Sequence, residues 1–302
     1  MRLTHLVAAS ALLCAPFSIV LRAQQLSSAI IADPAPDKAN PAAIETFQLP
    51  SHGALLNALV YVAAGAGPHP VVILLHGFPG NEKNLDLAQT IRRAGWDVLY
   101  FDYRGSWGSP GDFSFTHSIE DTHSAIAYMR DPANAKKLRA DPAFIVLAGH
   151  SMGGLMALQA GANDPAIKAI VTISAADFNA SRLQSLPADK RDAAMKRLAA
   201  GLAEEGMAPL AGCTPDSLAR EVIDNAARWN FVSLAPKLAT RPMLVLTSDD
   251  GLAPTNDALV EALHRVGNTN VNTIHMATDH SYSDHRIALQ EAVLDALASL
   301  QK

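Results

Sequence analysis

The stretch FIVLAGHSMGGLMALQAGA, residues 144–162, joins a short apolar run to a helix-forming segment of small residues through a glycine-rich turn. Its centre reads G-x-S-x-G, a pattern that in a strand–turn–helix context lifts a serine hydroxyl clear of a sheet. Gly149 and Gly153 leave room for the strained backbone that such a turn imposes on Ser151. Gly154 lets the following helix approach the strand closely. Because the free amides of that helix then face the reacting oxygen, we expect Ser151 to be a nucleophile.

The segments on either side of this stretch predict the fold class. Short runs that we interpret as continuously apolar recur and alternate with helix-forming segments, as expected for a parallel sheet covered by helices on both faces. We therefore expect an α/β fold with a mostly parallel central sheet flanked by helices. Strands are expected at 71–75, 97–101, 144–148, 169–173, 243–247 and 271–275, after an antiparallel pair at 44–49 and 54–63. Helices are expected at 85–95, 118–130 and 285–300, the second beginning at Ser118 with Asp121 in a capping-box-like position.

One region interrupts the alternation of strands and helices. Residues 176–236 contain no strand-like run but hold two helix-forming stretches, 188–206 and 214–230. An insertion between two sheet strands would lie over the carboxyl edge of the sheet, where ligands bind in such folds. A helical lid over the site is one interpretation, and a surface elaboration is the other.

A nucleophilic serine needs a base to remove its proton and an acid to orient that base. In G-x-S-x-G enzymes the acid and then the histidine follow the serine along the chain. The expected strand 243–247 leads directly into a pair of aspartates, followed by a Gly-Leu-Ala-Pro loop. We predict Asp250 as the acid. Asp249 remains the alternative, because the sequence does not fix the loop to within one residue.

The base is expected after the next strand, in HMATDHSYSDHR, residues 275–286. His275 ends a predicted strand, so we interpret it as a strand or core residue. His285 opens the last helix and is interpreted as a surface or capping residue. His280 lies in the loop between them and is the predicted base. A zinc site competes with this interpretation, but the spacing lacks a recognised ligand pattern such as H-x-x-x-H on one helix, so no metal ligand is assigned.

A tetrahedral oxyanion needs two N–H donors. The N–H of Met152, directly after the nucleophile, is one candidate. The run 71–80 ends the first long parallel strand in His-Gly-Phe, and the Phe78 N–H is the second. We expect His76 to brace this loop by hydrogen bonding rather than to transfer a proton.

The segment FDYRGSWGSPGDF, residues 101–113, bends after another predicted strand. Asp102 and Arg104 in this segment are interpreted as structural residues. For Trp107 two interpretations stay open: its ring lines the site, or it packs in the core or on the surface.

The amino terminus predicts export. Residues 1–23 carry a basic residue, Arg2, next to the initial methionine and continue into an apolar run that is short for a membrane span, which is typical of a signal peptide. A membrane anchor is the alternative. Residues 24–43 are expected to form a linker, because prolines and small residues dominate them. Removal of the leader, and Cys14 with it, leaves Cys213 as the only cysteine, so no internal disulfide is expected.

The composition suits one large domain, expected over residues 44–302, because 49% of the 302 residues are apolar. The net charge is −5, and no basic run is longer than Arg92-Arg93. A nucleic-acid partner is therefore not expected, and a small-molecule substrate is.

Five motifs together resemble the α/β-hydrolase superfamily over about residues 44–302: HGFPG, DYRGSWGS, GHSMGG, SDDGLAP and TDHSYSD. The likeness is strongest to carboxylesterases of the feruloyl-esterase and monoacylglycerol-lipase type and to prolyl-oligopeptidase-like catalytic domains. Carried over position by position, it implies a triad of Ser151, Asp250 and His280. It also implies ester hydrolysis through an acyl-enzyme, with no metal or organic cofactor.

Two other functions compete with a serine esterase. A peptidase acting on short peptides would share the machinery, and a pair of carboxylates that binds a free amine would favour it. Glu204 and Glu205 in the insertion are candidates for such a pair, although they also suit a solvated helix face. A non-catalytic binding protein on the same fold would have a damaged triad, whereas every member is present in this sequence.

Overall fold

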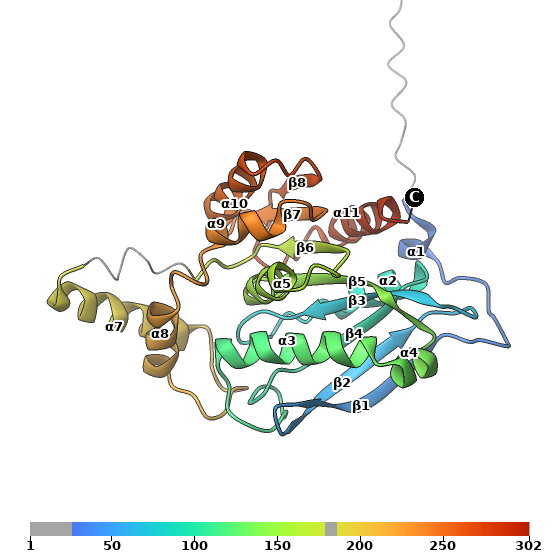
Figure 1. Cartoon of the computed structure of the whole chain (residues 1–302), viewed down its shortest axis with the longest axis horizontal. Coiled ribbons are helices and arrows are strands. Elements are labelled where there is room, and N and C mark those ends of the chain that lie inside the picture. Colours follow the sequence, from blue (N-terminus) through green and yellow to red (C-terminus); the bar gives the residue numbers. More distant parts are fainter. Residues whose placement is uncertain (1–25, 179–185, 302) are drawn as a thin grey trace, which may run out of the picture.

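A computed structural model of the chain describes residues 26–178 and 186–301. Its centre is an eight-stranded sheet with the order β1-β2-β4-β3-β5-β6-β7-β8. The pairs β1–β2 and β2–β4 are antiparallel, and every other neighbouring pair is parallel, which confirms the predicted α/β class. Figure 1 shows the twisted sheet running through the molecule between its helices. The strands are β1 (Ala43–Ser51), β2 (Ala54–Val62), β3 (His69–Leu75), β4 (Asp97–Phe101), β5 (Ala140–His150), β6 (Ala169–Ile173), β7 (Met243–Ser248) and β8 (Val271–Met276).

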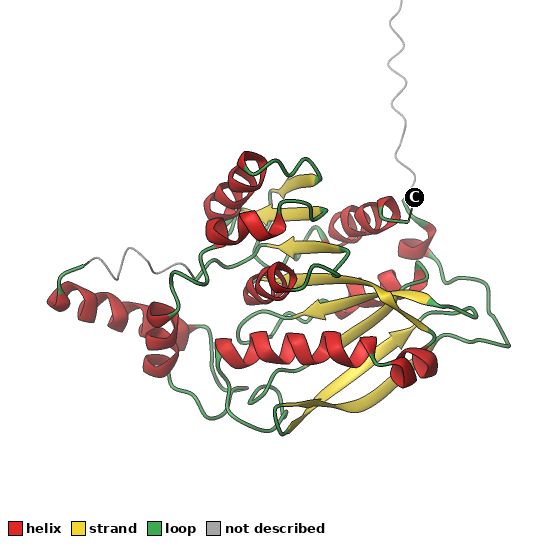
Figure 2. Ribbon diagram, in the orientation of Figure 1, coloured by secondary structure: helices red, strands yellow, loops and turns green. Residues whose placement is uncertain are grey.

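Helices cover both faces of the sheet, as Figure 2 shows. One face packs against α1 (Ser28–Ile31), α2 (Leu85–Arg93) and α11 (Arg286–Ser299). The other packs against α3 (Phe115–Arg130), α4 (Pro132–Leu138), α5 (Met152–Asn163), α8 (Pro215–Asp224), α9 (Phe231–Leu234), η1 (Ala235–Leu238) and α10 (Ala253–Arg265). The sheet therefore has a separate apolar core on each side.

The apolar run in β3 has a direct structural cause. Val72 and Leu74 point into the core beneath α2 and α11, whereas Val71, Ile73 and Leu75 point into the core beneath α5. Successive side chains of a strand alternate between faces, so a strand covered on both sides needs apolar residues at every position. Burial of each such side chain stabilises the fold by about 1.5–3 kcal/mol.

The sequence prediction for the last strand is wrong in one respect. β8 forms where expected, but it is the edge of the sheet, and its residues 272–275 are exposed. Only one neighbour, β7, pairs with it. The run is therefore not buried on both faces, which agrees with the polar side chains of Asn272 and Thr273 within it.

The start of α3 also differs from the prediction. The helix begins at Phe115, and the Ser114 hydroxyl accepts the His117 N–H at 3.0 Å. Ser118 lies one turn inside the helix, where its hydroxyl donates to the Ser114 carbonyl. Asp121 is not part of a capping box, because Arg104 holds its carboxylate.

The insertion contains α7 (Ala188–Glu204) and α8, close to the two helices predicted there. Residues 209–211 join the insertion to the body of the protein. The Trp107 N–H donates to the Pro209 carbonyl at 2.9 Å, and the Ala211 N–H donates to the Gly105 carbonyl at 2.8 Å. Figure 1 shows α7 beside α8 at the end of the molecule farthest from α11.

The predicted signal peptide, residues 1–23, lies outside the described residues. Within the predicted linker, residues 28–31 form the short helix α1, and Ala29 is buried. Its carbonyl accepts a hydrogen bond from Nε of Arg93 at 2.5 Å, which ties the segment to α2. Among the helices in residues 26–178 and 186–301, none is both long and apolar enough to span a bilayer.

Candidate active site

The predicted nucleophile lies at the turn between β5 and α5. Ser151 has φ 56° and ψ −122°, a conformation that the surrounding backbone must hold in place. A Cβ atom at Gly149 would lie 2.0 Å from the carbonyl oxygen of Gly153. A Cβ atom at Gly154 would lie 2.4 Å from the Cβ of Ala175. The strained turn and its need for glycine are therefore as the sequence predicts.

The predicted base pairs with the residue predicted as the acid. Nδ1 of His280 lies 2.7 Å from Oδ2 of Asp250, whose side chain is only 5% exposed. Asp249 has a side chain that is 64% exposed, and it pairs with His275 instead. A carboxylate only accepts hydrogen bonds, so Nδ1 carries the proton and Nε2 of His280 keeps a lone pair for the serine. The geometry therefore favours Asp250 over its neighbour.

The surroundings of Asp250 keep it ionised. Burial by itself raises the pKa of this carboxyl. The hydrogen bond from His280 and that from the Leu252 N–H, at 2.9 Å, outweigh burial, so the net pKa lies below its ordinary value. The hydroxyls of Ser174 and Ser248 lower this pKa further. A negatively charged carboxylate at this position can orient a neighbouring histidine and stabilise that histidine when it becomes protonated during a reaction.

Three buried hydroxyls behind the carboxylate form a network that the sequence analysis missed. Oγ of Ser174 lies 2.9 Å from Oγ of Ser248 and 3.1 Å from the hydroxyl of Tyr282. Burial raises the pKa of Tyr282 to about 12, so its phenol keeps its proton. Ser174 directly follows β6, and Ser248 is the last residue of β7. Their positions at the carboxyl ends of neighbouring strands are the signal that could have found them.

His150, the residue before the nucleophile, is a second contact that the sequence analysis missed. Its Nε2 lies 2.8 Å from the carbonyl oxygen of His280, and the two rings lie 4.7 Å apart. The carbonyl only accepts, so Nε2 of His150 donates. Burial lowers the pKa of His150 to about 4, so the ring is neutral. The turn that carries the predicted nucleophile thus holds the loop that carries the predicted base.

The three histidines of residues 275–286 each pair with a different aspartate. His275 bonds to Asp249 at 3.1 Å, and His285 bonds to Asp284 at 2.9 Å. The remaining histidine, His280, pairs with Asp250. His275 lies on β8 as predicted, but its side chain is half exposed and not in the core. His285 occupies the position before α11 without capping it. Within the described part of the chain, no three metal-ligating side chains converge.

The two predicted oxyanion donors lie beside the nucleophile. A Cβ atom at Gly77 would lie 2.9 Å from the Cβ of Ser151, so this loop passes directly over the serine. Phe78 follows in the loop and lines the same cavity as Ser151. Met152 is the first residue of α5, so its N–H has no acceptor within its own helix. Phe78 and Met152 therefore both border the cavity that contains Ser151.

Side chains hold the loop that carries Phe78. Nδ1 of His76 donates to the Gly77 carbonyl at 2.7 Å, as predicted for a bracing residue. That carbonyl and the Phe78 N–H belong to one planar peptide group and point in opposite directions, so this bond also directs the N–H. Burial lowers the pKa of His76 to about 4, which keeps the ring neutral. Nε1 of Trp107 donates to the Pro79 carbonyl at 2.8 Å, so this indole braces the loop and does not line the site.

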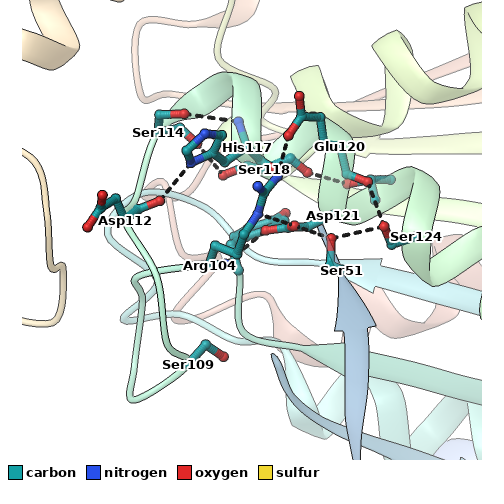
Figure 3. Close-up of polar contacts among 12 residues, drawn as sticks. Ser51, Arg104, Ser109, Asp112, Ser114, His117, Ser118, Glu120, Asp121 and Ser124 are labelled. Carbon is teal, nitrogen blue, oxygen red and sulfur yellow. Dashed lines mark hydrogen bonds and ion pairs between the residues drawn. The ribbon is translucent and has the colours of Figure 1, made fainter. Parts of the chain in front are cut away.

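Asp102 and Arg104 have the structural role predicted for them. Figure 3 shows the Arg104 guanidinium between two acidic side chains of α3. Its Nε bonds to Asp121 at 2.7 Å, and its Nη2 pairs with Glu120. Asp102 accepts from Nζ of Lys83 at 3.0 Å.

The reacting groups open onto two adjoining cavities. One is larger, about 430 Å³, and its wall is mainly apolar. The other is smaller, about 130 Å³, and its wall includes several polar residues. The larger cavity is lined by Phe78, Ser151, Met152, Ala176, Phe178, Leu202, Glu205, Asp250, Leu252 and His280. The smaller is lined by Gly77, Phe78, Pro79, Gly80, Asn81, Glu82, His150, Ser151, Glu205, His280 and Ser281.

Two curated proteins are similar to this chain. The polyketide transferase ATR5 of Stachybotrys chlorohalonatus is 25% identical over 241 residues, which cover 67% of this chain and 77% of ATR5. The quorum-quenching protein AidA of Acinetobacter baumannii is 28% identical over 138 residues, which cover 44% of each chain.

Solved structures of esterases share the fold. A thermostable carboxyl esterase from Bacillus coagulans superposes with a TM-score of 0.65 at 17% identity, covering 85% of this chain and 99% of that one. The carboxylesterase EstE1, from a metagenomic library, superposes with a TM-score of 0.63 at 22% identity, covering 87% of this chain and 90% of that one. Est1E of Butyrivibrio proteoclasticus, solved with ferulic acid bound, gives 0.61 at 19% identity, with coverage of 84% and 98%.

A family model agrees with this architecture. The model that describes the alpha/beta hydrolase fold matches residues 70–271, which include the strained serine, the acid and the loop that carries Phe78. The match covers more than half of the sequence. The chain therefore belongs to the alpha/beta hydrolase fold family.

Proposed function

We propose that this protein hydrolyses carboxylic esters through an acyl-enzyme formed on Ser151. The observation that carries the proposal is the pairing of His280 with the buried Asp250 beside a serine held in a strained turn. This arrangement supplies a nucleophile, a base in the correct tautomer and an ionised acid. The esterases that share the fold support the choice of substrate class.

The proposed reaction has two halves. In the first, Ser151 Oγ attacks the ester carbonyl while its proton passes to Nε2 of His280. The N–H groups of Phe78 and Met152 stabilise the oxyanion, and the protonated histidine then gives its proton to the departing alcohol. In the second half, His280 takes a proton from a water molecule, whose oxygen attacks the acyl carbonyl. The bond between the acyl carbon and Ser151 Oγ then breaks, His280 returns the proton to Oγ, and the carboxylic acid leaves.

We expect Ser151 and His280 to act together. Both residues line both cavities, so a substrate in either one meets the two side chains. The hydrogen bond between a nucleophile and its base is commonly long before substrate binds and shortens in the complex.

Two features of the insertion bear on its role. It supplies Phe178, Leu202 and Glu205 to the wall of the larger cavity, which supports its interpretation as a lid that helps to form the site. Glu204 lines neither cavity. The pair of Glu204 and Glu205 considered for amine binding is thus not assembled at the site.

The test is a substrate screen with the wild-type protein and Ser151→Ala. We expect the wild type to hydrolyse p-nitrophenyl esters and to leave aminoacyl-nitroanilides intact. Ser151→Ala should retain only a residual rate, on the order of 10³–10⁴ over water, from the oxyanion hole and binding. Hydrolysis of the anilides in preference to the esters would establish the peptidase instead.

We also propose that the protein is exported, because residues 1–23 have the composition of a signal peptide. Cell fractionation and amino-terminal sequencing of the mature protein test this proposal. We expect a chain that begins near residue 24 outside the cytoplasm, and a full-length chain in the membrane fraction would indicate an anchor.

A further inference from the structure

Glu205 occupies an unusual place in the site. It is one of four residues that line both cavities, and the other three are Phe78, Ser151 and His280. Those three are the proposed oxyanion donor, nucleophile and base. Glu205 has no assigned part in the reaction, yet its carboxylate borders the space where the ester must lie.

The chain directs Glu205 towards the site through the geometry of α7. Glu205 follows the last residue of this helix and keeps helical dihedral angles, and Gly206 then turns the chain with φ 85°. Residues three apart lie on one face of a helix, so Glu205 shares a face with Leu202, which lines the larger cavity. Glu204 lies on a different face and lines neither cavity. Two adjacent glutamates therefore differ in whether they face the site.

Among residues 26–178 and 186–301, no cation forms an ion pair with Glu205. The nearby cations Lys83 and Arg286 pair with Asp102 and Asp86. The smaller cavity has a second carboxylate, that of Glu82, in its wall. A substrate that enters the site therefore meets the negative charge of these carboxylates, and no lysine or arginine of the described residues lines the cavities to balance it.

We propose that Glu205 sets the charge preference of this site. It favours esters that carry an ammonium group near the reacting carbonyl and disfavours esters that carry an anionic group there. The inference rests on the proposed ester hydrolysis and adds the chemical class of the preferred substrate. Because Glu205 borders both cavities, the preference applies whether the charged group belongs to the acyl or the alcohol part.

The size of the effect follows from the exposure of the carboxylate. Glu205 is exposed to solvent, so water and salt screen its charge. A single screened carboxylate near the ammonium group of a bound substrate is expected to change kcat/KM by about three- to tenfold. High salt should reduce the effect, because the Debye length falls to about 3 Å at 1 M ionic strength.

The experiment uses three acetate esters and three forms of the full-length protein. The esters are acetylcholine, its uncharged isostere with a tert-butyl group in place of trimethylammonium, and an analogue that carries a sulfonate. The proteins are the wild type, Glu205→Gln and the matched control Glu204→Gln. kcat/KM is measured in a pH-stat at low and high salt, and the ratios between esters are compared among proteins, which cancels the intrinsic reactivity of each ester.

We expect Glu205→Gln to lower the cation-to-neutral ratio and to raise the anion-to-neutral ratio, each by about three- to tenfold. Glu204→Gln should keep the wild-type ratios, and high salt should move the wild type towards Glu205→Gln. If the uncharged ester is hydrolysed but Glu205→Gln keeps the wild-type ratios, or both variants shift alike, the inference is overturned and ester hydrolysis stands. If the wild type hydrolyses none of the esters, ester hydrolysis itself fails, and the inference fails with it.

Discussion

Nε2 of His150 donates a hydrogen bond of 2.8 Å to the backbone carbonyl of His280. His150 directly precedes the proposed nucleophile, and His280 is the proposed base. A single contact therefore joins the two loops that must meet for the reaction. His150 is buried and neutral, because burial lowers its pKa to about 4. The bond therefore keeps the same donor across the ordinary range of pH.

His150→Phe tests the importance of this contact for activity. Without the donor, the carbonyl of His280 loses its partner and the base loop is no longer held against the serine turn. Small misplacements of reacting groups are costly, so we expect kcat/KM to fall about 10- to 100-fold. Active-site titration checks the result by giving the rate per folded site. A rate per site equal to that of the wild type would show that the contact does not position the base.

The same variant makes a prediction about stability and pH. The folded-state pKa of His150, about 4, lies below the ordinary value of 6.5, so the unfolded chain binds more protons between these values. His150 therefore lowers the free energy of unfolding of the wild type as the pH falls from 6.5 towards 4, by up to about 3 kcal/mol. His150→Phe should lose less stability than the wild type over that window, as measured by urea unfolding at several pH values. Parallel losses in the two proteins would contradict the burial of a neutral ring.

Ser248→Ala tests the hydroxyl network behind the acid. Loss of the hydroxyl raises the depressed pKa of Asp250 towards its ordinary value, because a hydrogen bond to the ionised form is gone. At neutral pH the variant should be less stable by about 1–3 kcal/mol. A depressed carboxyl pKa stabilises the folded protein at pH values above the ordinary carboxyl pKa, and this stabilisation is lost in acid. The difference in free energy of unfolding between the wild type and Ser248→Ala should therefore narrow as the pH falls through the depressed pKa of Asp250.

The matched control for this network is Ser283→Ala. Its hydroxyl is exposed and belongs to the same loop as His280, and its carboxylate partner is the exposed Asp279 and not Asp250. We expect it to leave both stability and its pH dependence within about 0.5 kcal/mol of the wild type. If this variant reproduced the effect of Ser248→Ala, the network would have no special role.

The three neighbouring histidines are expected to behave differently when each is replaced by alanine. His280→Ala should lower kcat by several orders of magnitude, because His280 is the only one of these three histidines that lines the cavities beside Ser151. His275→Ala and His285→Ala remove exposed pairs with aspartates, so each should change stability by less than about 1 kcal/mol and keep the rate per site. Kinetics with active-site titration on the three variants identifies the base. An inactive His285→Ala would show that the base is His285, one Asp-His repeat later.

Local features of the site could be predicted from the sequence, because local sterics determine them. The turn at Ser151 is one example, since a Cβ atom at Gly149 would clash with the carbonyl of Gly153 only four residues along the chain. The bracing role of His76 is another, because the contact lies within one loop. The same applies to most strands, whose apolar runs report burial on both faces.

Contacts between distant segments could not be predicted in this way. Ser174 and Ser248 are 74 residues apart and meet only because β6 and β7 are neighbours in the sheet. The choice between Asp249 and Asp250 depends on which side chain the loop buries, and adjacent identical residues carry no sequence signal for that. The exposure of His275 follows from the position of β8 at the edge, which the order of strands along the chain does not reveal.

The most direct test of the account is to identify the residue that carries the acyl group. The wild type and Ser151→Ala are each mixed with a p-nitrophenyl ester, quenched in acid within the burst phase and digested for peptide mass spectrometry. A fluorophosphonate probe provides a parallel label. We predict that the wild type carries one acyl group and one probe molecule on Ser151, and that the variant carries neither. Ester turnover without modification of Ser151, or with the label on another residue, would contradict the account.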